Sequence, residues 1–367
     1  MQKGLITTFY KAHNYGAMLQ AYALKNILES NGYKIEFLNY KDKHIENGYK
    51  LFNLKNKSIK NKIKTIVKDI IFYRKHKKRI CNFNRFQNEK LKETQYIIKE
   101  NDFLNLKENF IITGSDQVWN PEITGGLSNI YTLNFCKNNI KKISYAASIG
   151  NEKNVSKHPK DYINKISKID RISVREESAK EELKKILPDK KIEVVLAPTL
   201  LLTKKEWEKN INFSNKNEEK YILAYIVAKD SEHSKIVNEL SKKTGLRVIH
   251  FENKKRYKKV LKSAYTEGPL EFINLIKNAE YVIATSFHAT VFSIIFNKKF
   301  WIVPHKTTGS RVTDLLKKLV ISNRAVNTID EFNNKDYNEE IDYEKVNKLL
   351  EKERQKSIDW LMDAIEK

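Results

Sequence analysis

The chain has 367 residues, 40% of them apolar, which is enough for two domains that each bury a hydrophobic core. Its formal net charge of +24 suits an anionic partner, but no run approaches the roughly 18 apolar residues of a membrane-spanning helix. The two cysteines, Cys81 and Cys136, lack the spacing of a zinc site or a disulfide framework. Met1 to Tyr10 has no signal-peptide pattern, so we expect a cytoplasmic protein.

The chain opens with a predicted βαβ unit. Lys3 to Phe9 is a short apolar strand, Ala17 to Ser30 is a helix, and Ile35 to Leu38 is the next strand. One face of the helix is apolar and is therefore expected to pack on the sheet: Met18, Leu19, Tyr22, Ala23, Leu24, Ile27 and Leu28.

The loop before this helix holds His13, Asn14 and Gly16. It joins the carboxyl end of a strand to a helix N-terminus, a position that suits an anion or an acceptor group, and Gly16 would let a ligand approach the backbone. The loop is not a GxGxxG dinucleotide fingerprint. The alternative is that Asn14 only caps the helix.

A strongly basic region lies between Lys50 and Lys90. It carries 14 lysines and arginines against two acidic residues, so half of the net charge falls in about a ninth of the chain. Six apolar residues within it have the spacing of one helical face: Ile63, Ile66, Val67, Ile70, Ile71 and Phe72. The pattern predicts a mostly helical segment over Leu51 to Lys99. This segment either contacts nucleic acid, an anionic membrane or an acidic glycan, or forms a solvated or sheet-packed face.

A second polar loop follows the expected strand Phe110 to Thr113. It runs from Gly114 to Pro121, GSDQVWNP, and places Ser115, Asp116 and Gln117 directly after a buried strand. Glycine and polar side chains gathered at such a strand end indicate a ligand-binding loop rather than a linker.

Two further strands, Lys142 to Ser148 and Arg171 to Val174, complete the first half. Arg175 follows the second of them, at its carboxyl end. An arginine there can hold a carboxylate or a phosphate through two hydrogen bonds. Alternatively, it forms a salt bridge with one of the two glutamates that follow it.

A strand-to-turn junction at Ala197-Pro198-Thr199 marks the predicted domain boundary, because the β and α patterns restart beyond it. We expect an N-terminal domain over residues 1–195, with a basic helical insertion near 50–99, and a C-terminal domain over 196–350. A last helix over 351–367 is able to pack back on the first domain.

The second half is organised around a βαβ unit. Tyr281 to Ile283 ends a buried strand, Val291 to Phe296 has helical spacing, and Phe300 to Val303 resumes the strand pattern. A right-handed crossover makes the two strands parallel.

His288 falls in the first turn of the crossover helix, with Thr285 and Ser286 placed to cap it. Ligands of open α/β sheets bind at this edge, and the positive helix end favours phosphate or carboxylate. A histidine here can donate a proton or a hydrogen bond to an oxyanion. The alternative is a helix histidine that only bonds the backbone.

Six motifs together resemble the polysaccharide pyruvyl transferase family over nearly the whole chain. They occur in family order: ITTFYKAHNYGAMLQAYAL, TGSDQVWNP, ISYAASIG, ISVREES, APTLLL, and TSFHATVFSIIFNKKF followed by GSR. Each motif alone is weak, and the set is specific.

The resemblance implies an α/β fold like the B-type glycosyltransferases, with two Rossmann-like domains and a cleft between them. Characterised members transfer the enolpyruvyl skeleton of phosphoenolpyruvate to two hydroxyls of a sugar, which gives a pyruvate ketal and releases phosphate. The implied partners are phosphoenolpyruvate and a sugar or lipid-linked glycan, with no cofactor. A metal is not expected either, because the sequence shows no carboxylate cluster of ligand spacing. Peripheral contact with the inner face of the membrane would use Lys50 to Lys90, and nucleic acid is not an expected partner.

The family motifs also imply roles for individual residues. His288 matches the family histidine and is expected to act as general acid or phosphate ligand, and Arg175 matches the arginine that clamps the donor. Asp116 is the expected base or orienting group for an acceptor hydroxyl. The remaining expected contacts are Thr285, Ser286 and Arg311 on the donor side, and His13, Asn14, Gly16, Ser115 and Gln117 on the acceptor or anion side.

The chain departs from the family pattern at three places. Ser286 stands where many members have arginine, Gly16-Ala17 stands where many have Gly-Asp, and Ala197-Pro198-Thr199 replaces a frequent Asp-Pro-Thr. The first change removes one phosphate contact.

Two other functions remain open from the sequence. One is a glycosyltransferase-like enzyme on the same scaffold that uses a nucleotide sugar. The other is a non-catalytic basic binding protein, which would need neither His288 nor Arg175 and would show a steep salt dependence.

Overall fold

The computed structural model describes residues 1–42, 44–45, 58, 61–62, 70–95, 97–99, 102, 104–137, 140–210, 219–227, 231–253, 256–304 and 309–367. The basic residues from Lys50 to Lys60 lie outside this set, as do Ile63, Ile66 and Val67 of the expected apolar stripe.

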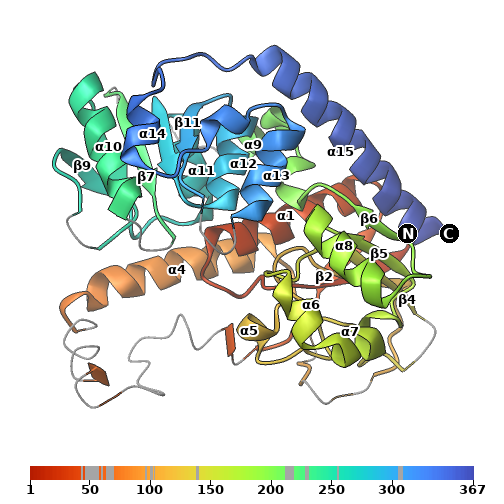
Figure 1. Cartoon of the computed structure of the whole chain (residues 1–367). Coiled ribbons are helices and arrows are strands. Elements are labelled where there is room, and N and C mark those ends of the chain that lie inside the picture. The colour runs from red at the N-terminus through yellow and green to blue at the C-terminus, as the bar shows by residue number, and fades with distance from the viewer. Residues whose placement is uncertain are drawn as a thin grey trace. The chain divides into compact units, whose positions relative to one another are not determined.

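The chain divides into two compact units, each built on a parallel α/β sheet, which confirms the expected fold class (Figure 1). The first unit comprises Met1–Thr65, Arg85–Leu202 and Lys352–Lys367. The second comprises Ile66–Asn84 and Thr203–Glu351. None of the helices in the described part of the chain is both long and apolar enough to cross a bilayer.

The first unit contains a six-stranded parallel sheet. Its strand order is β2 (Lys34–Phe37), β1 (Lys3–Thr7), β3 (Phe110–Thr113), β4 (Lys141–Ala147), β5 (Arg171–Val174) and β6 (Ile192–Val194). All of β3 is buried, as is β1 after its first residue. Continuous burial is typical of parallel strands whose two faces are both covered by helices.

The helices of the first unit follow its strands. They are α1 (Tyr15–Ser30), α5 (Pro121–Thr124), α6 (Lys153–Lys157), α7 (Pro159–Ile166) and α8 (Glu177–Ile186), with a 3-10 turn at Pro198–Leu200. Helices α6, α7 and α8 contact one another and lie side by side in Figure 1. Every residue of the predicted apolar face of α1 is buried, as expected.

The prediction for the start of α1 was wrong by two residues. The helix begins at Tyr15 because the Asn14 Oδ1 accepts a hydrogen bond from the Ala17 backbone N–H at 3.2 Å, which caps it there. Gly16 therefore lies inside the first turn of the helix and not in the loop.

The helical prediction over Leu51 to Lys99 was too long. Its described part contains α4 (Tyr73–Lys90), and residues 91–95 and 97–99 are not helical. Glu93 and Ile98 form β-bridges with Phe37 and Tyr40, so this segment pairs along the edge strand β2 instead of continuing the helix.

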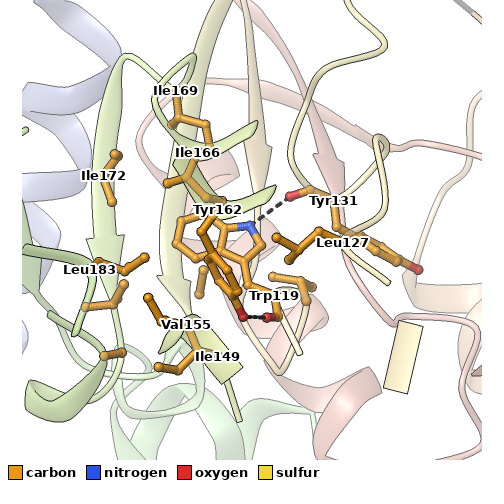
Figure 2. Close-up of a cluster of buried hydrophobic side chains, with 14 of the residues drawn as sticks. Trp119, Leu127, Tyr131, Ile149, Val155, Tyr162, Ile166, Ile169, Ile172 and Leu183 are labelled. Atoms are coloured by element: carbon orange, nitrogen blue, oxygen red, sulfur yellow. Dashed lines mark hydrogen bonds between the residues drawn. The ribbon is translucent and has the colours of Figure 1, made fainter. Parts of the chain in front are cut away.

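One large core cluster of the first unit surrounds Trp119 of the GSDQVWNP loop (Figure 2). The indole Nε1 donates a hydrogen bond to the Tyr131 carbonyl at 3.0 Å, and the Tyr162 hydroxyl donates one to the Trp119 carbonyl at 2.6 Å. Burial of the indole together with these two hydrogen bonds fixes the loop to α7 and to the segment that contains Tyr131.

The second unit contains a five-stranded parallel sheet in the order β11 (Lys299–Ile302), β10 (Tyr281–Ala284), β7 (Tyr221–Tyr225), β8 (Arg247–His250) and β9 (Val260–Ser263). Its helices are α9 (Lys204–Lys209), α10 (Ser231–Thr244), α11 (Pro269–Lys277), α12 (Phe287–Ile295), α13 (Ser310–Lys318) and α14 (Ile329–Asn333), with a 3-10 turn at Ser322–Arg324. Helix α10 packs with α14, and α12 packs with both α11 and α13. The last helix, α15 (Tyr343–Glu366), begins in this unit and ends in the first.

Candidate active site

Each sheet has one point where its strand order reverses direction. In the first unit, β2 lies on one side of β1 and β3 lies on the other, so the order reverses between β1 and β3. In the second unit, β8 and β9 lie on one side of β7 and β10 lies on the other, so the order reverses between β7 and β10. The two helices that follow such a pair of strands cover opposite faces, so the carboxyl ends of the pair are the usual ligand site of an open α/β sheet. Asp116 follows β3 and His288 follows β10, so each lies at the reversal point of its own sheet.

A buried hydrogen-bond network holds the ends of β1 and β3 together. The Gln20 Oε1 accepts a hydrogen bond from the Ser115 N–H at 3.1 Å, and its Nε2 donates to the Thr8 hydroxyl at 2.8 Å. The Thr8 hydroxyl in turn donates to the Ser115 carbonyl at 2.8 Å. Gln20 and Ser115 have no solvent exposure, so this network fixes the loop that carries Asp116.

The backbone of this loop takes conformations that few residues adopt. Gly114 has φ of 107°, and a Cβ placed there would lie 2.3 Å from the Tyr145 carbonyl oxygen, so only glycine fits. Asp116 has φ of 81° although it carries a side chain. Such backbone strain gathers at functional sites, because the surrounding structure must hold it in place.

The loops after β3, β4 and β5 are joined at the same sheet edge. The Asp116 carbonyl accepts a hydrogen bond from the Ser148 N–H at 3.0 Å, and the Arg175 N–H donates to the Ala147 carbonyl at 3.2 Å. Asp116 and Arg175 are thus held on either side of the end of β4. The structure brings together two residues that lie far apart in the sequence.

The Arg175 side chain forms a buried ion pair with its neighbour. Its Nε donates to the Glu176 Oε1 at 2.9 Å, and the two side chains are 3% and 5% exposed. The salt bridge considered from the sequence is therefore present. Loss of one partner would leave an uncompensated charge in a dry environment, which limits how Arg175 can be tested.

Gln117 is half-buried and belongs to an amide chain behind Asp116. Its Oε1 accepts a hydrogen bond from the Asn120 Nδ2 at 2.8 Å, and the Asn120 Oδ1 accepts one from the Asn154 Nδ2 at 3.0 Å. Asn120 also caps α5. Gln117 therefore links the loop to α5 and to the start of the following helices.

The first loop is also at this edge, because it follows β1. Asn14 caps α1 with its side-chain oxygen, as the alternative interpretation proposed, and His13 beside it is half-buried. Gly16 is buried within α1.

In the second unit, Thr285 ties the two strands of the reversal point together. Its Oγ1 accepts a hydrogen bond from the Val227 N–H at 3.0 Å, and its own N–H donates to the Tyr225 carbonyl at 3.1 Å. Ser286 is the N-cap residue of α12, but its side chain makes no capping hydrogen bond. The expectation that both side chains cap the helix was wrong, because the Thr285 hydroxyl instead accepts a hydrogen bond from the chain just after β7.

His288 is the second residue of α12 and is half-buried. Its ring lies edge-on against the Phe287 ring, with 5.3 Å between the centroids. The free N–H groups and the dipole of the helix make this end electropositive, so an anionic group near His288 would be stabilised.

Arg311 is the second residue of α13 and is half-buried. Helix α13 packs on α12, which carries His288. Arg311 therefore belongs to the same unit as His288, whereas Arg175 and Asp116 belong to the first unit.

Sequence reasoning missed Gln20 and Thr8, which hold the Asp116 loop. Gln20 is the one polar residue with no exposure in α1. A glutamine on an otherwise apolar helix face was the available signal, since a buried amide needs hydrogen-bond partners. Among the described residues, no group of three or more His, Cys, Asp or Glu side chains has a metal-binding arrangement.

Comparison with known proteins gives one family and several distant folds. The family model for polysaccharide pyruvyl transferase matches residues 14–307. No curated protein sequence matches the chain.

Three solved structures illustrate the distant folds. The UDP-GlcNAc 2-epimerase of Methanocaldococcus jannaschii is 13% identical over 96% of this chain and 99% of that one, with a TM-score of 0.49. The enzyme of the same name from Neisseria meningitidis is 12% identical over 99% and 100%, with a TM-score of 0.47. The heptosyltransferase WaaC of E. coli is 10% identical over 85% and 90%, with a TM-score of 0.38. At these identities none of the three carries information about the substrate of this chain.

Proposed function

This chain belongs to the polysaccharide pyruvyl transferase family, and from that membership we propose that it transfers the pyruvyl group of phosphoenolpyruvate to a cell-surface glycan or its lipid-linked precursor. The family match over residues 14–307 carries the proposal. The placement of Asp116 and His288 at the reversal points of their sheets supports an enzyme over a binding protein, because binding through surface charge alone requires no such placement.

The proposed reaction forms two carbon–oxygen bonds and breaks one. A proton adds to the methylene carbon of phosphoenolpyruvate, and a sugar hydroxyl attacks the oxocarbenium-like carbon that results. A second hydroxyl of the same sugar then displaces the phosphate, which closes the ketal. Of the two protons that the hydroxyls lose, one balances the new methyl group and the other leaves with the phosphate.

The residue roles follow from this chemistry. His288 is the proposed general acid or phosphate ligand, at a helix end that stabilises anions. Asp116 is the proposed base or orienting group for the acceptor hydroxyl. Arg175 is the proposed clamp for the donor carboxylate or phosphate.

Ser286, Thr285 and Arg311 complete the proposed donor side. Ser286 replaces the arginine of many family members, and its side chain makes no capping bond. We propose that Arg311, on the helix packed against α12, supplies positive charge in its place. His13, Asn14, Gly16, Ser115 and Gln117 are the proposed contacts on the acceptor or anion side.

Thermal unfolding with ligands tests the donor directly. A ligand that binds only the folded protein raises its stability by mass action, so phosphoenolpyruvate should raise the unfolding temperature and a nucleotide sugar should not. His288→Ala should lower kcat for phosphate release by about 100-fold or more, while the unfolding temperature without ligand stays near that of the unaltered protein. The exposed His158 gives a matched control, and His158→Ala should change neither value.

Arg175 needs a paired design because its ion pair is buried. Arg175→Gln combined with Glu176→Gln removes both charges at once and so avoids an unpaired one. This double variant should lose stabilisation by phosphoenolpyruvate. Stabilisation by a nucleotide sugar in place of phosphoenolpyruvate would favour the glycosyltransferase alternative, and full activity of His288→Ala would remove that histidine from the mechanism.

Peripheral membrane contact is a second part of the proposal. Arg74, Lys75, Lys77 and Lys78 are exposed on α4, and no carboxylate pairs with them in the part of the chain that the structure describes. Ile70 and Ile71 directly before them are 62% and 68% exposed. Cationic side chains beside exposed isoleucines suit an anionic lipid surface, so we propose that the enzyme works at the inner face of the membrane.

A further inference from the structure

The first unit contains a cavity of about 820 Å³ that the proposed reaction has not used. Four segments line it: the chain after β2, residues 97–99 and 102, the turn after α5, and α7. The turn after α5 is close in sequence to the Asp116 loop. Asn120 of that loop caps the start of α5, and the turn follows the end of this four-residue helix. The cavity and the proposed acceptor side therefore share one continuous segment of the chain.

The walls of the cavity are fixed by the fold. Gly125 and Gly126 have φ of 69° and 116°, and the Thr124 hydroxyl donates to the Gly126 carbonyl at 2.6 Å, which holds the turn. Leu127 is buried in the cluster around Trp119 (Figure 2). The Lys165 ammonium of α7 donates to the Leu127 carbonyl, so the turn and the helix are joined.

The second wall is an extended pair of segments. Tyr40 and Ile98 form a parallel β-bridge, and the Ile98 N–H donates to the Asn39 carbonyl at 2.9 Å. The adjacent Ile97 is 59% exposed, although it is a large apolar residue. The half-buried Tyr40 and the exposed Ile97 thus give the cavity an apolar surface.

Some charged groups at the cavity hold the fold together and others do not. Lys165 joins the turn to α7, and the Asp102 Oδ2 accepts a hydrogen bond from the Lys99 backbone N–H at 2.9 Å. Lys41 and Lys99 are exposed, and neither ammonium contacts a carboxylate among the described residues. Asp161, on α7, is an exposed carboxylate that likewise has no cationic partner within the described set. Among the described residues, the cavity therefore offers the Lys41 and Lys99 ammonium groups without a carboxylate partner and Asp161 without a cationic one, beside Asp102 and Lys165.

We infer that this cavity binds an anionic oligosaccharide. Sugar rings carry apolar C–H faces that pack on aromatic and aliphatic side chains, and hydroxyls that need acceptors, so Tyr40, Ile97 and Asp161 match the two sides of a sugar. A carboxylate or phosphate on the chain would pair with Lys41 and Lys99. The volume falls in the range of pockets that enclose small ligands, roughly 300–1,000 Å³.

The inference rests on the proposed function and makes it more specific. The acceptor would be a glycan that carries acidic groups near the sugar to be modified, and this cavity would hold those neighbouring units. Glycans of this kind take their charge either from uronic acids or from phosphate, and the same two lysines suit both.

Saturation-transfer NMR with defined sugars tests the inference without any need for activity. The probes are a hyaluronan tetrasaccharide for carboxylates, glucose 1-phosphate for phosphate, and maltotriose as a neutral sugar. We expect transfer to one or both anionic probes and weaker transfer to maltotriose. Raising the salt concentration should weaken the anionic probes alone, because the lysines are exposed.

Two double variants locate the site. Lys41→Gln with Lys99→Gln should weaken binding of the anionic probe about tenfold, since two charge-assisted contacts are lost. Lys107→Gln with Lys168→Gln removes two exposed lysines of the same unit outside the cavity and should leave binding unchanged. All four substitutions are on exposed side chains. Unfolding temperatures of both double variants equal to that of the unaltered protein would verify that they fold.

The outcomes separate this inference from the donor proposal. Equal weakening by both double variants, or equal binding of maltotriose and the anionic probes, would overturn it. Stabilisation by phosphoenolpyruvate without binding of any oligosaccharide would overturn the inference and leave the donor proposal standing. Binding of an anionic probe at Lys41 and Lys99 without any response to phosphoenolpyruvate would support the inference and overturn the donor proposal.

Discussion

At the scale of single residues, Gln20 shows how a core position can serve a site. It has no solvent exposure, and it bonds the Ser115 N–H, the Thr8 hydroxyl and the Ala17 carbonyl at once. A leucine fills a similar volume but bonds none of these groups. The stability of the Asp116 loop therefore depends on one amide.

Gln20→Leu should destabilise the protein by about 3 kcal/mol, because it leaves buried polar groups without partners. Urea-induced unfolding measures the change. Asn26→Leu on the same helix is the control, since the Asn26 Nδ2 donates to the Tyr22 carbonyl one turn earlier and its side chain is half-buried. If Gln20→Leu lowered the free energy of unfolding by no more than Asn26→Leu does, the loop would not depend on the network.

The sequence indicated the loop and left a signal at Gln20, but it could not show which groups Gln20 bonds. Gly114, Ser115 and Asp116 stood out because small and polar residues followed a buried strand. The partner of Ser115 lies 95 residues earlier in the chain, and no local pattern connects them. Arg175 is the opposite case: its partner Glu176 is its neighbour, so the pairing was one of the two alternatives that the sequence left open.

At the scale of elements, α15 links the end of the chain to the first sheet. The Arg354 Nε donates to the Leu200 carbonyl at 2.8 Å, and the Leu196 N–H donates to the Ser357 hydroxyl at 3.0 Å. Both bonds reach the segment after β6, where irregular backbone would otherwise lack partners. The helix thus completes the hydrogen bonding of that segment within the first unit.

Arg354→Met should cost about 2 kcal/mol of unfolding free energy, because a hydrogen bond from a charged and nearly buried donor is lost and the Leu200 carbonyl is left without it. Lys356→Met, two residues later, removes only an exposed pair with Glu353 and should cost less than about 0.5 kcal/mol. Urea unfolding of the two variants side by side gives the comparison. Equal costs would show that α15 contributes only its apolar contacts.

Strands and helices were predictable where burial left a periodic pattern. The βαβ units around α1 and α12 are examples, because their apolar residues decide which face packs on the sheet. The end of the basic helix could not be predicted in this way. After Lys90, the β-bridges of Glu93 and Ile98 with Phe37 and Tyr40 override the local preference for helix. The capping of α12 was also mispredicted, because the Thr285 hydroxyl accepts a hydrogen bond from the Val227 N–H, in the chain just after β7.

At the scale of the whole molecule, the net charge of +24 decides which surfaces the protein can approach. A large positive charge attracts membranes and nucleic acids alike, so charge alone does not select a partner. The exposed Ile70 and Ile71 beside the cations of α4 favour lipid, because apolar side chains gain free energy by entering a bilayer interface and gain little on a phosphate backbone. The proposal of membrane contact therefore predicts two separate requirements, charge and apolar surface.

Co-sedimentation with vesicles tests both requirements in the full chain. The protein should bind vesicles that contain phosphatidylglycerol and not vesicles of phosphatidylcholine alone, and salt at about 0.5 M should release it. Lys77→Glu with Lys78→Glu should weaken binding at least about tenfold, at about 1 kcal/mol for each lost cation. Lys345→Glu with Lys348→Glu makes the same charge change on exposed residues of α15 and should have a much smaller effect.

Ile70→Ser with Ile71→Ser separates the lipid from other anionic partners. The net charge stays the same, so a protein held by electrostatic attraction alone would bind as before, whereas insertion of apolar side chains predicts weaker binding to the vesicles. A short DNA duplex serves as the competing ligand in the same assay. If the serine variant kept full vesicle binding and the duplex displaced the vesicles, the basic face of α4 would be a nucleic-acid surface, and the enzyme would have no need of the membrane. If the serine variant lost vesicle binding but bound the duplex as before, the protein would bind lipid through both its apolar side chains and its positive charge.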